Sequence, residues 1–284
     1  MKRIARIIAV FMNTFNSGIN SCGGYRCCTE DSQNWSSFDL GCDSISGNYK
    51  LHSNKDGEWL MNTRITEIQT ALERLNSLLP LKQRQKELPP RLKALHQFIL
   101  RSLAADGSIP EARELDPWGD SASLSVTLQT LAEQDLIVRD PSGNSVVGAY
   151  PVTLENTPHK VTINNHCINA MCALDAVSIA PLFEQEVAIR SVCHLSNAPL
   201  YIQQKDMNVI DAQPSQDIVV GIRWQQPRGY AAHSMCTEMV FLKDRPAAEQ
   251  WQQQQQNGEQ QAITLFTLRE AIELGAAFFI PLLD

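Results

Sequence analysis

Residues 159–183 read HKVTINNHCINAMCALDAVSIAPLF, and their hydrophobic pattern changes partway from that of a strand to that of a helix. Val161 and Ile163 alternate with polar residues, which is typical of a half-buried strand. Residues 164–166 are polar and indicate a turn, and the apolar segment from Cys172 onward predicts a helix. We therefore expect strand, turn and helix in this order, with Cys172 near the first helical turn.

Cys172 and Asp175 are the residues of the segment NAMCALDAVSIA that we single out for chemistry. Residues three apart share one face of a helix, so both side chains can contact the same bound atom. The amides and dipole of a helix N-terminus favour a thiolate, which predicts a lowered pKa for Cys172. The ordinary alternative is a small buried cysteine beside a surface carboxylate, and the spacing by itself favours that alternative because C-x-x-D is common by chance.

The chain after residue 150 mixes further short strands and helices. The segments VAIRSVC, DIVVGIRW, EMVFL and AITLFT are strand candidates, and TLREAIELGAAFF is a helix candidate. Residues 151–284 therefore predict an α+β core of small antiparallel or mixed sheets with flanking helices.

Residues 61–150 predict a helical, winged-helix-like domain. Apolar residues recur at helical spacing from Met61 to Pro80 and again from Leu92 to Leu103. A turn at residues 140–143 then separates two strand candidates, as in a helix-turn-helix closed by a hairpin. Residues 86–140 hold six basic and nine acidic residues, so we expect a covering role and no nucleic-acid binding.

Residues 1–60 are rich in Asn, Ser, Gly and Asp and lack sustained periodicity, which predicts a disordered or non-native extension. Four of the eight cysteines lie here, at Cys22, Cys27, Cys28 and Cys42. Their spacing matches no standard zinc pattern. The alternative is a relay that passes a soft metal between thiolates.

Composition narrows the class of protein. A chain of 284 residues with a net charge of −7 is large enough for a sizeable core and lacks the overall basic charge of a nucleic-acid or membrane-surface binder. Its longest apolar runs are too short to span a bilayer, which needs about 20 residues.

The basic and apolar start resembles a signal peptide, but Arg6 interrupts it and no clean cleavage site follows, so a cytoplasmic location is expected. Free cysteines there indicate catalysis or metal binding.

Several segments together resemble the organomercurial (alkylmercury) lyase family. These segments are GAYPVTLENTPHKVTI, the string CALD after a short strand, the cysteine in SVCHLSNAP, SMC before EMVFL and RPAAEQW, and LREAIELGAAFF. The resemblance covers roughly residues 85–284, in order and at similar separations. Residues 1–60 do not resemble the family.

The resemblance implies roles for four residues. Cys172 and Cys236 correspond to the two catalytic cysteines that hold mercury, Asp175 to the catalytic aspartate, and Cys193 to a cysteine of structural role. Some members have two adjacent cysteines at the second position, whereas Thr237 follows Cys236 here, which removes a possible alternative ligand. The family fold joins a winged-helix-like part to small antiparallel sheets with helices.

The implied reaction is protonolysis of a carbon–mercury bond, giving a hydrocarbon and Hg(II) in mercury detoxification. Mercury(II) is a soft cation that prefers thiolates, and a nearby carboxylic acid can deliver the proton. No organic cofactor is expected, and external thiols and a mercuric reductase would remove the product. Two alternatives are a metal-responsive winged-helix regulator and a protein that binds mercury without cleaving its bond to carbon.

Overall fold

The structure is a computed structural model that describes residues 55–119, 121–256 and 262–284. Residues 1–54 of the expected 1–60 extension, with the four cysteines of the proposed relay, lie outside the described residues, whereas residues 55–60 are helical. The helix expected from Met61 extends further toward the N-terminus, because helix α2 spans Lys55–Leu78. Among the described residues, no helix is long and apolar enough to cross a membrane.

Helices dominate the described residues from 55 to 133, before a hairpin forms. The helices are α2 (Lys55–Leu78), α3 (Leu81–Glu87), α4 (Pro90–Asp106), α5 (Ala112–Leu115), the 3₁₀ turn η1 (Asp116–Trp118) and α6 (Ser121–Glu133). Gly107 ends α4 with a φ of 66°, a left-handed conformation that glycine adopts without strain. Strands β1 (Ile137–Arg139) and β2 (Val146–Ala149) pair antiparallel around the predicted turn.

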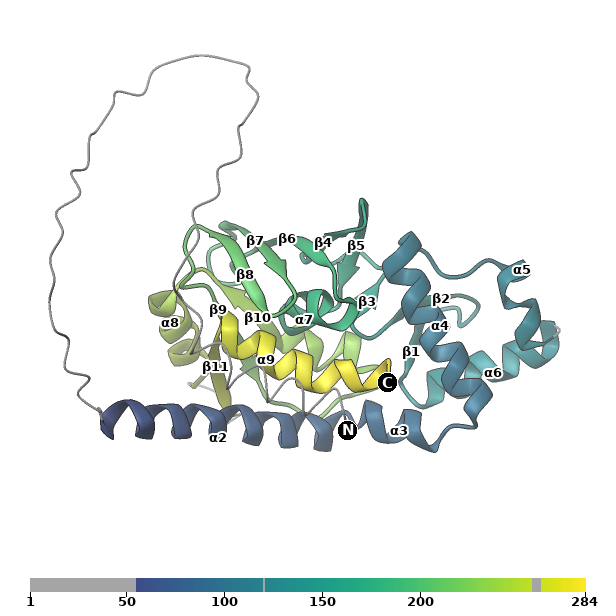
Figure 1. Ribbon diagram of the computed structural model, residues 1–284, viewed down its shortest axis with the longest axis horizontal. Coiled ribbons are helices and arrows are strands. Elements are labelled where there is room, and N and C mark those ends of the chain that lie inside the picture. The colour runs from purple at the N-terminus through teal and green to yellow at the C-terminus, as the bar shows by residue number, and fades with distance from the viewer. Residues whose placement is uncertain (1–54, 120, 257–261) are drawn as a thin grey trace, which may run out of the picture. The chain divides into compact units, whose positions relative to one another are not determined.

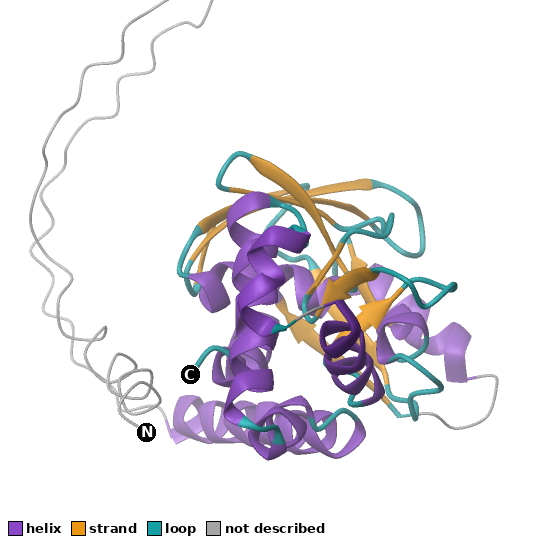
Figure 2. Ribbon diagram, turned by 90° about the vertical axis from the view of Figure 1, so that its right-hand side faces the viewer, coloured by secondary structure: helices purple, strands orange, loops and turns teal. Residues whose placement is uncertain are grey.

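The remaining elements alternate strands with a few helices. They are β3 (Val152–Thr153), β4 (Lys160–Ile163), β5 (His166–Ala170), α7 (Ala173–Phe183), β6 (Glu186–Val192), β7 (Pro199–Lys205), β8 (Asn208–Gln213), β9 (Val219–Arg223), η2 (Ala231–His233), η3 (Cys236–Glu238), β10 (Met239–Leu242), α8 (Arg245–Gln256), β11 (Ile263–Thr267), α9 (Leu268–Phe279) and η4 (Ile280–Leu282). Figure 2 shows the strands gathered together and flanked by helices.

The strands form two antiparallel sheets, which confirms the expected α+β class. One has the order β1-β2-β3-β5-β4-β6-β7-β8, and the other has the order β10-β9-β11. The β1–β2 hairpin of the helical part therefore belongs to the same sheet as the strands that follow residue 150.

The structure contains one strand between residues 159 and 183 that the sequence analysis did not predict. The turn does not lead directly into the helix, because residues His166–Ala170 form β5, which pairs with β4 as a hairpin. Asn164 and Asn165 connect the two strands with φ values of 48° and 66°. Asparagine tolerates this left-handed conformation, and two-residue hairpin turns require it.

Helix α7 lies at the centre of the core. All ten of its residues from Ala173 to Leu182 are buried. Helix α9 packs against both α7 and α2, as Figure 1 shows. The α7–α9 approach depends on Gly275, since a Cβ atom there would lie 1.9 Å from the Ser178 hydroxyl oxygen. This packing holds the N-terminal end of α7, and with it Cys172, in a rigid frame.

Candidate active site

Cys172 is the N-cap residue of helix α7. Strand β5 ends at Ala170, and Cys172 keeps an extended backbone before the helix begins at Ala173. Its Sγ accepts a hydrogen bond of 3.4 Å from the backbone N–H of Asp175. This contact fixes the cysteine and the aspartate on one side of the first helical turn, as their spacing predicted.

Cys236 reaches the same place from a distant part of the chain. It begins the turn η3, directly before strand β10, rather than the strand itself. The Sγ atoms of Cys172 and Cys236 and a carboxylate oxygen of Asp175 all lie within 4.8 Å of one another. The three side chains are buried: Cys172, Cys236 and Asp175 have exposed fractions of 1%, 4% and 2% respectively. The structure thus brings together the three residues that the sequence singled out.

Burial determines the protonation of this cluster. It raises the pKa of the Cys172 thiol well above its usual range, and interactions with Cys236 and Asp175 add to that increase. A hydrogen bond with Cys172 favours the thiolate of Cys236. Burial and the nearby carboxylates of Asp175 and Asp135 outweigh this effect and raise the pKa of the Cys236 thiol. The lowered pKa expected for Cys172 was therefore wrong, because desolvation of the thiolate exceeds the effect of the helix N-terminus.

Asp175 is poised to exchange a proton near neutral pH. Burial raises its pKa to about 7, although hydrogen bonding with the two thiols and with the Cys172 backbone favours the carboxylate. Its Oδ2 atom is buried and has no hydrogen-bond partner among the described residues. A buried oxygen without a hydrogen-bond partner lowers the stability of the fold, and such atoms are rare. This oxygen is therefore a suitable acceptor for a group that binds in the site. The cluster combines two soft sulfur ligands with one carboxyl group that can be either acid or base.

Cys193 lies apart from this cluster. It follows strand β6 and is fully buried, as expected of a structural residue. Burial opposes ionisation, but hydrogen bonds from the Ser196 side chain and from the backbone at Lys243, Ser196 and Leu195 prevail and lower the pKa of the thiol. Cys167, in contrast, is exposed on β5.

A second buried group of polar residues lies next to Cys236, and sequence reasoning missed it. Asp135 Oδ1 accepts a 2.8 Å hydrogen bond from the Tyr150 hydroxyl, and its Oδ2 accepts one of 3.1 Å from the backbone N–H of Ala231. The Tyr150 hydroxyl oxygen in turn accepts a 2.9 Å hydrogen bond from the N–H of Ala232. Asp135 and Tyr150 come from the helical part of the chain, and no local pattern could have linked them to residues 231–232.

Met239 is a further neighbour that sequence reasoning missed. Its Sδ lies 3.6 Å from the Sγ of Cys172, and its side chain is buried. A methionine in a strand that is buried along its length normally indicates only core packing. Its contact with a thiol becomes visible only when β10 and α7 are placed together.

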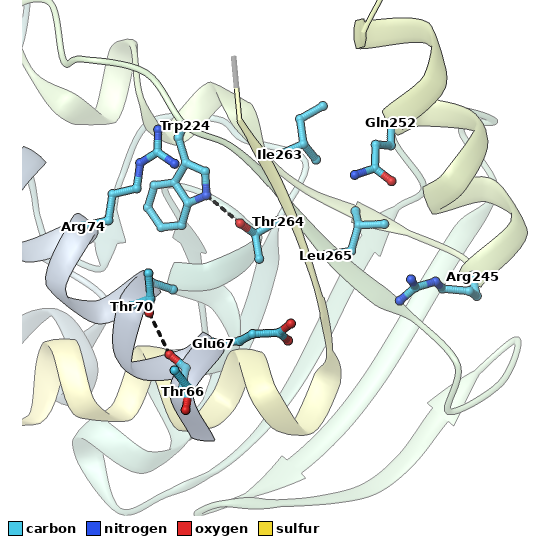
Figure 3. A pocket seen from close by; sticks show the side chains of 11 residues that line it. Thr66, Glu67, Thr70, Arg74, Trp224, Arg245, Gln252, Ile263, Thr264 and Leu265 are labelled. Carbon is cyan, nitrogen blue, oxygen red and sulfur yellow. Dashed lines mark hydrogen bonds between the residues drawn. The ribbon is translucent and has the colours of Figure 1, made fainter. Parts of the chain in front are cut away.

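A groove of about 740 Å³ lies elsewhere, between α2, β11 and α8. Figure 3 shows Arg74, Trp224 and Arg245 among the side chains that line it. The guanidinium carbon of Arg74 lies 5.0 Å from the centre of the Trp224 ring. None of Cys172, Asp175 and Cys236 lines this groove. We assign the candidate site to the buried cluster because its side chains, unlike those of the groove, can bind a soft metal and supply a proton.

Comparisons with known proteins give one family name. The family model described as Alkylmercury lyase matches residues 152–280, a range that contains all three clustered residues. The chain is 27% identical over 216 residues to proteins named Alkylmercury lyase from Bacillus cereus and from Clostridium butyricum, covering 76% of this chain and 91% of each relative. A protein of the same name from Staphylococcus epidermidis is 29% identical over 182 residues, covering 64% of this chain and 79% of the relative.

A solved structure shares the fold. The crystal structure of the mercury-bound form of MerB2 superposes with a TM-score of 0.59 at 17% sequence identity. The match covers 72% of this chain and 98% of that one. At this level of identity the match supports the architecture of the described residues.

Proposed function

The chain belongs to the alkylmercury lyase family, and from that premise we propose that it cleaves the carbon–mercury bond of organomercurial compounds. The observation that carries the proposal is the buried cluster of Cys172, Asp175 and Cys236, with ligand atoms within 4.8 Å of one another. The products are a hydrocarbon and Hg(II) bound by the two cysteines.

The two thiols bind and activate the mercury atom. An alkyl- or arylmercury cation already carries one carbon ligand, and a soft metal of this kind prefers sulfur for its further ligands. Each cysteine releases its proton as its Sγ bonds to mercury. The two thiolates increase the electron density on mercury and weaken its bond to carbon, so that the carbon leaves with the bonding electron pair.

Asp175 transfers the proton that completes the reaction. The carboxylate accepts a proton from a binding thiol and then donates it to the leaving carbon, forming a carbon–hydrogen bond as the carbon–mercury bond breaks. Two thiol protons are released in all, of which one goes to carbon and the other to solvent. A pKa of about 7 supports this role, because the group is then neither a strong acid nor a strong base.

Product removal requires groups outside the chain. We propose that cellular thiols, and a mercuric reductase after them, take Hg(II) from Cys172 and Cys236 by ligand exchange. Because thiolates and a carboxyl group supply all the chemistry above, we propose that no organic cofactor takes part. We also propose a cytoplasmic location, where thiols stay reduced.

We propose a winged-helix-like arrangement for residues 61–150, followed by a catalytic core at residues 151–284. Helices α4 and α6 and the β1–β2 hairpin support this arrangement. Helix α6, in the place of a recognition helix, contains no Lys or Arg, which supports a role in covering the site over a role in binding DNA.

The direct test is to incubate the purified chain with phenylmercury and excess thiol and to measure benzene. Stoichiometric or catalytic benzene release supports the lyase. Retention of phenylmercury without benzene would instead indicate a protein that only binds organomercurials. Tight, mercury-dependent binding to a DNA duplex would indicate a regulator.

A further inference from the structure

Met239 brings a third sulfur atom to the candidate site. It is the first residue of β10 and lies three positions after Cys236, which begins η3. Its Sδ is 3.6 Å from the Sγ of Cys172, which donates its thiol hydrogen to the thioether. The Met239 side chain is 3% exposed, so its sulfur contacts the interior of the protein rather than solvent.

The separation of the two sulfur atoms suits ligands of one metal ion. Two sulfur ligands of a tetrahedral ion, with metal–sulfur bonds of about 2.3 Å, lie about 3.8 Å apart. The observed 3.6 Å between Cys172 and Met239 is close to that value. Cys236 lies within 4.8 Å of the same Cys172 atom, so a metal bound there has three sulfur atoms nearby.

The chemistry of a thioether fits the needs of this buried site. Thioether sulfur is soft and polarisable, so it is a suitable ligand for a soft cation. It is also uncharged, and it therefore adds a ligand without burying another negative charge next to Asp175 and the thiolates. When carbon leaves mercury, the metal loses one ligand, and the thioether beside Cys172 is a soft atom that can take its place.

We propose that Met239 is a third soft ligand for mercury, which binds Hg(II) together with Cys172 and Cys236 and slows its loss before transfer to an external thiol. That this Hg(II) arises by cleavage of an organomercurial rests on the proposed function. Binding of Hg(II) itself does not depend on turnover, so the two ideas can fail separately.

The chain provides a matched control in Met171. This methionine directly precedes Cys172 and is 7% exposed, so it resembles Met239 in burial and in closeness to the site along the chain. Its methyl carbon packs at Gly148, since a Cβ atom on that glycine would lie 2.9 Å from it. Met171→Leu and Met239→Leu therefore remove the same thioether from two buried positions with little change in volume.

The experiment loads the purified full chain and both variants with one equivalent of HgCl2 and measures mercury X-ray absorption. We expect three sulfur neighbours in the wild type and in Met171→Leu, and two in Met239→Leu. In a competition with a dithiol, Met239→Leu should release half of its Hg(II) at a dithiol concentration about tenfold lower.

Two outcomes would overturn the proposal. One is a wild-type spectrum with only two sulfur neighbours, which needs no variant and is independent of how well the variants fold. The other is equal dithiol sensitivity of Met239→Leu and Met171→Leu, with circular dichroism showing both folded. Failure of the wild type to release benzene from phenylmercury would overturn the proposed function but leave the three-sulfur coordination of Hg(II) standing.

Discussion

The phenolic hydroxyl of Tyr150 donates a 2.8 Å hydrogen bond to the carboxylate of Asp135, and both side chains are buried. The Oδ2 atom of Asp135 accepts a hydrogen bond from the backbone N–H of Ala231, and the hydroxyl oxygen of Tyr150 accepts one from that of Ala232. These two alanines begin η2, which ends three residues before Cys236. The pair therefore connects the helical part of the chain to the segment that positions a cysteine of the site.

Tyr150→Phe is expected to weaken this connection. It removes the hydrogen bond to Asp135 and leaves the N–H of Ala232 without its acceptor, at a cost of about 1–3 kcal/mol in the free energy of unfolding. Hydrocarbon release should also slow, because the segment before Cys236 is held less firmly. Urea unfolding and benzene release measure the two effects. Tyr201→Phe on β7 is the control, and equal stability of the two variants would contradict the prediction.

Replacing either clustered cysteine with serine should abolish mercury retention and turnover together. Cys172→Ser and Cys236→Ser exchange a soft thiolate for a hard, weakly acidic hydroxyl that binds mercury poorly. Cys193→Ser should mainly lower stability, because Cys193 is buried apart from the site. Mercury stoichiometry after dialysis and benzene release measure both properties, with exposed Cys167→Ser as a control. Normal mercury retention by Cys236→Ser would remove that residue from the site.

Asp175→Asn separates binding from chemistry. The amide keeps the size and polarity of the side chain but cannot carry an acidic proton, so phenylmercury should still bind through the thiols. Single-turnover benzene release should be about 100-fold slower or more, which is the usual contribution of a general acid. Asp217→Asn, at an exposed position, is the control. Near-normal release from Asp175→Asn would show that water or another acid protonates the carbon.

A chain that begins at Met61 is expected to fold and keep most of its turnover. Ala71, Leu75 and Leu79, which are buried, follow this point and remain to pack in the core. Circular dichroism and benzene release test the expectation against the full chain. A large loss of turnover with unchanged folding would support a relay through the cysteines of residues 1–60.

The contribution of two buried histidines to stability should fall as the pH decreases from about 6.5 to about 4, while Asp175, whose pKa burial raises to about 7, acts in the opposite direction over this range. Burial lowers the pKa of His96 from 6.5 to about 4, against a hydrogen bond with the Leu136 carbonyl, and burial also lowers that of His159 to about 4. Because the unfolded chain binds these protons first, their contribution to stability is fully present above pH 6.5 and is lost on acidification. Each histidine contributes at most about 3 kcal/mol.

Urea unfolding of the wild type and of His159→Gln at several pH values between 7 and 4 measures this contribution. Relative to the wild type, the variant should lose less stability on acidification, and His166→Gln on the exposed start of β5 is the control. Parallel curves for the wild type and His159→Gln would contradict the assignment.

Local patterns were sufficient for much of the fold and for two of the three clustered residues. The helical spacing of Leu95, Ile99 and Leu103 matches their burial in α4, and the alternation of Val161 and Ile163 matches the burial pattern of β4. The three-residue spacing of Cys172 and Asp175 was by itself enough to place both on one helical turn. These features depend on neighbours within a few positions, and such neighbours are visible in the sequence.

The third clustered residue depended on contacts between distant parts of the chain. Cys236 follows Cys172 by 64 positions, and only the packing of β10, which directly follows the turn of Cys236, against α7 brings their sulfur atoms together. The same packing placed Met239 beside Cys172 and reversed the expected shift of the cysteine's pKa. Hydrophobic periodicity specifies which face of an element is buried, but not which side chains pack against that face. The desolvation of a thiol, and with it the shift of its pKa, depends on those packing partners.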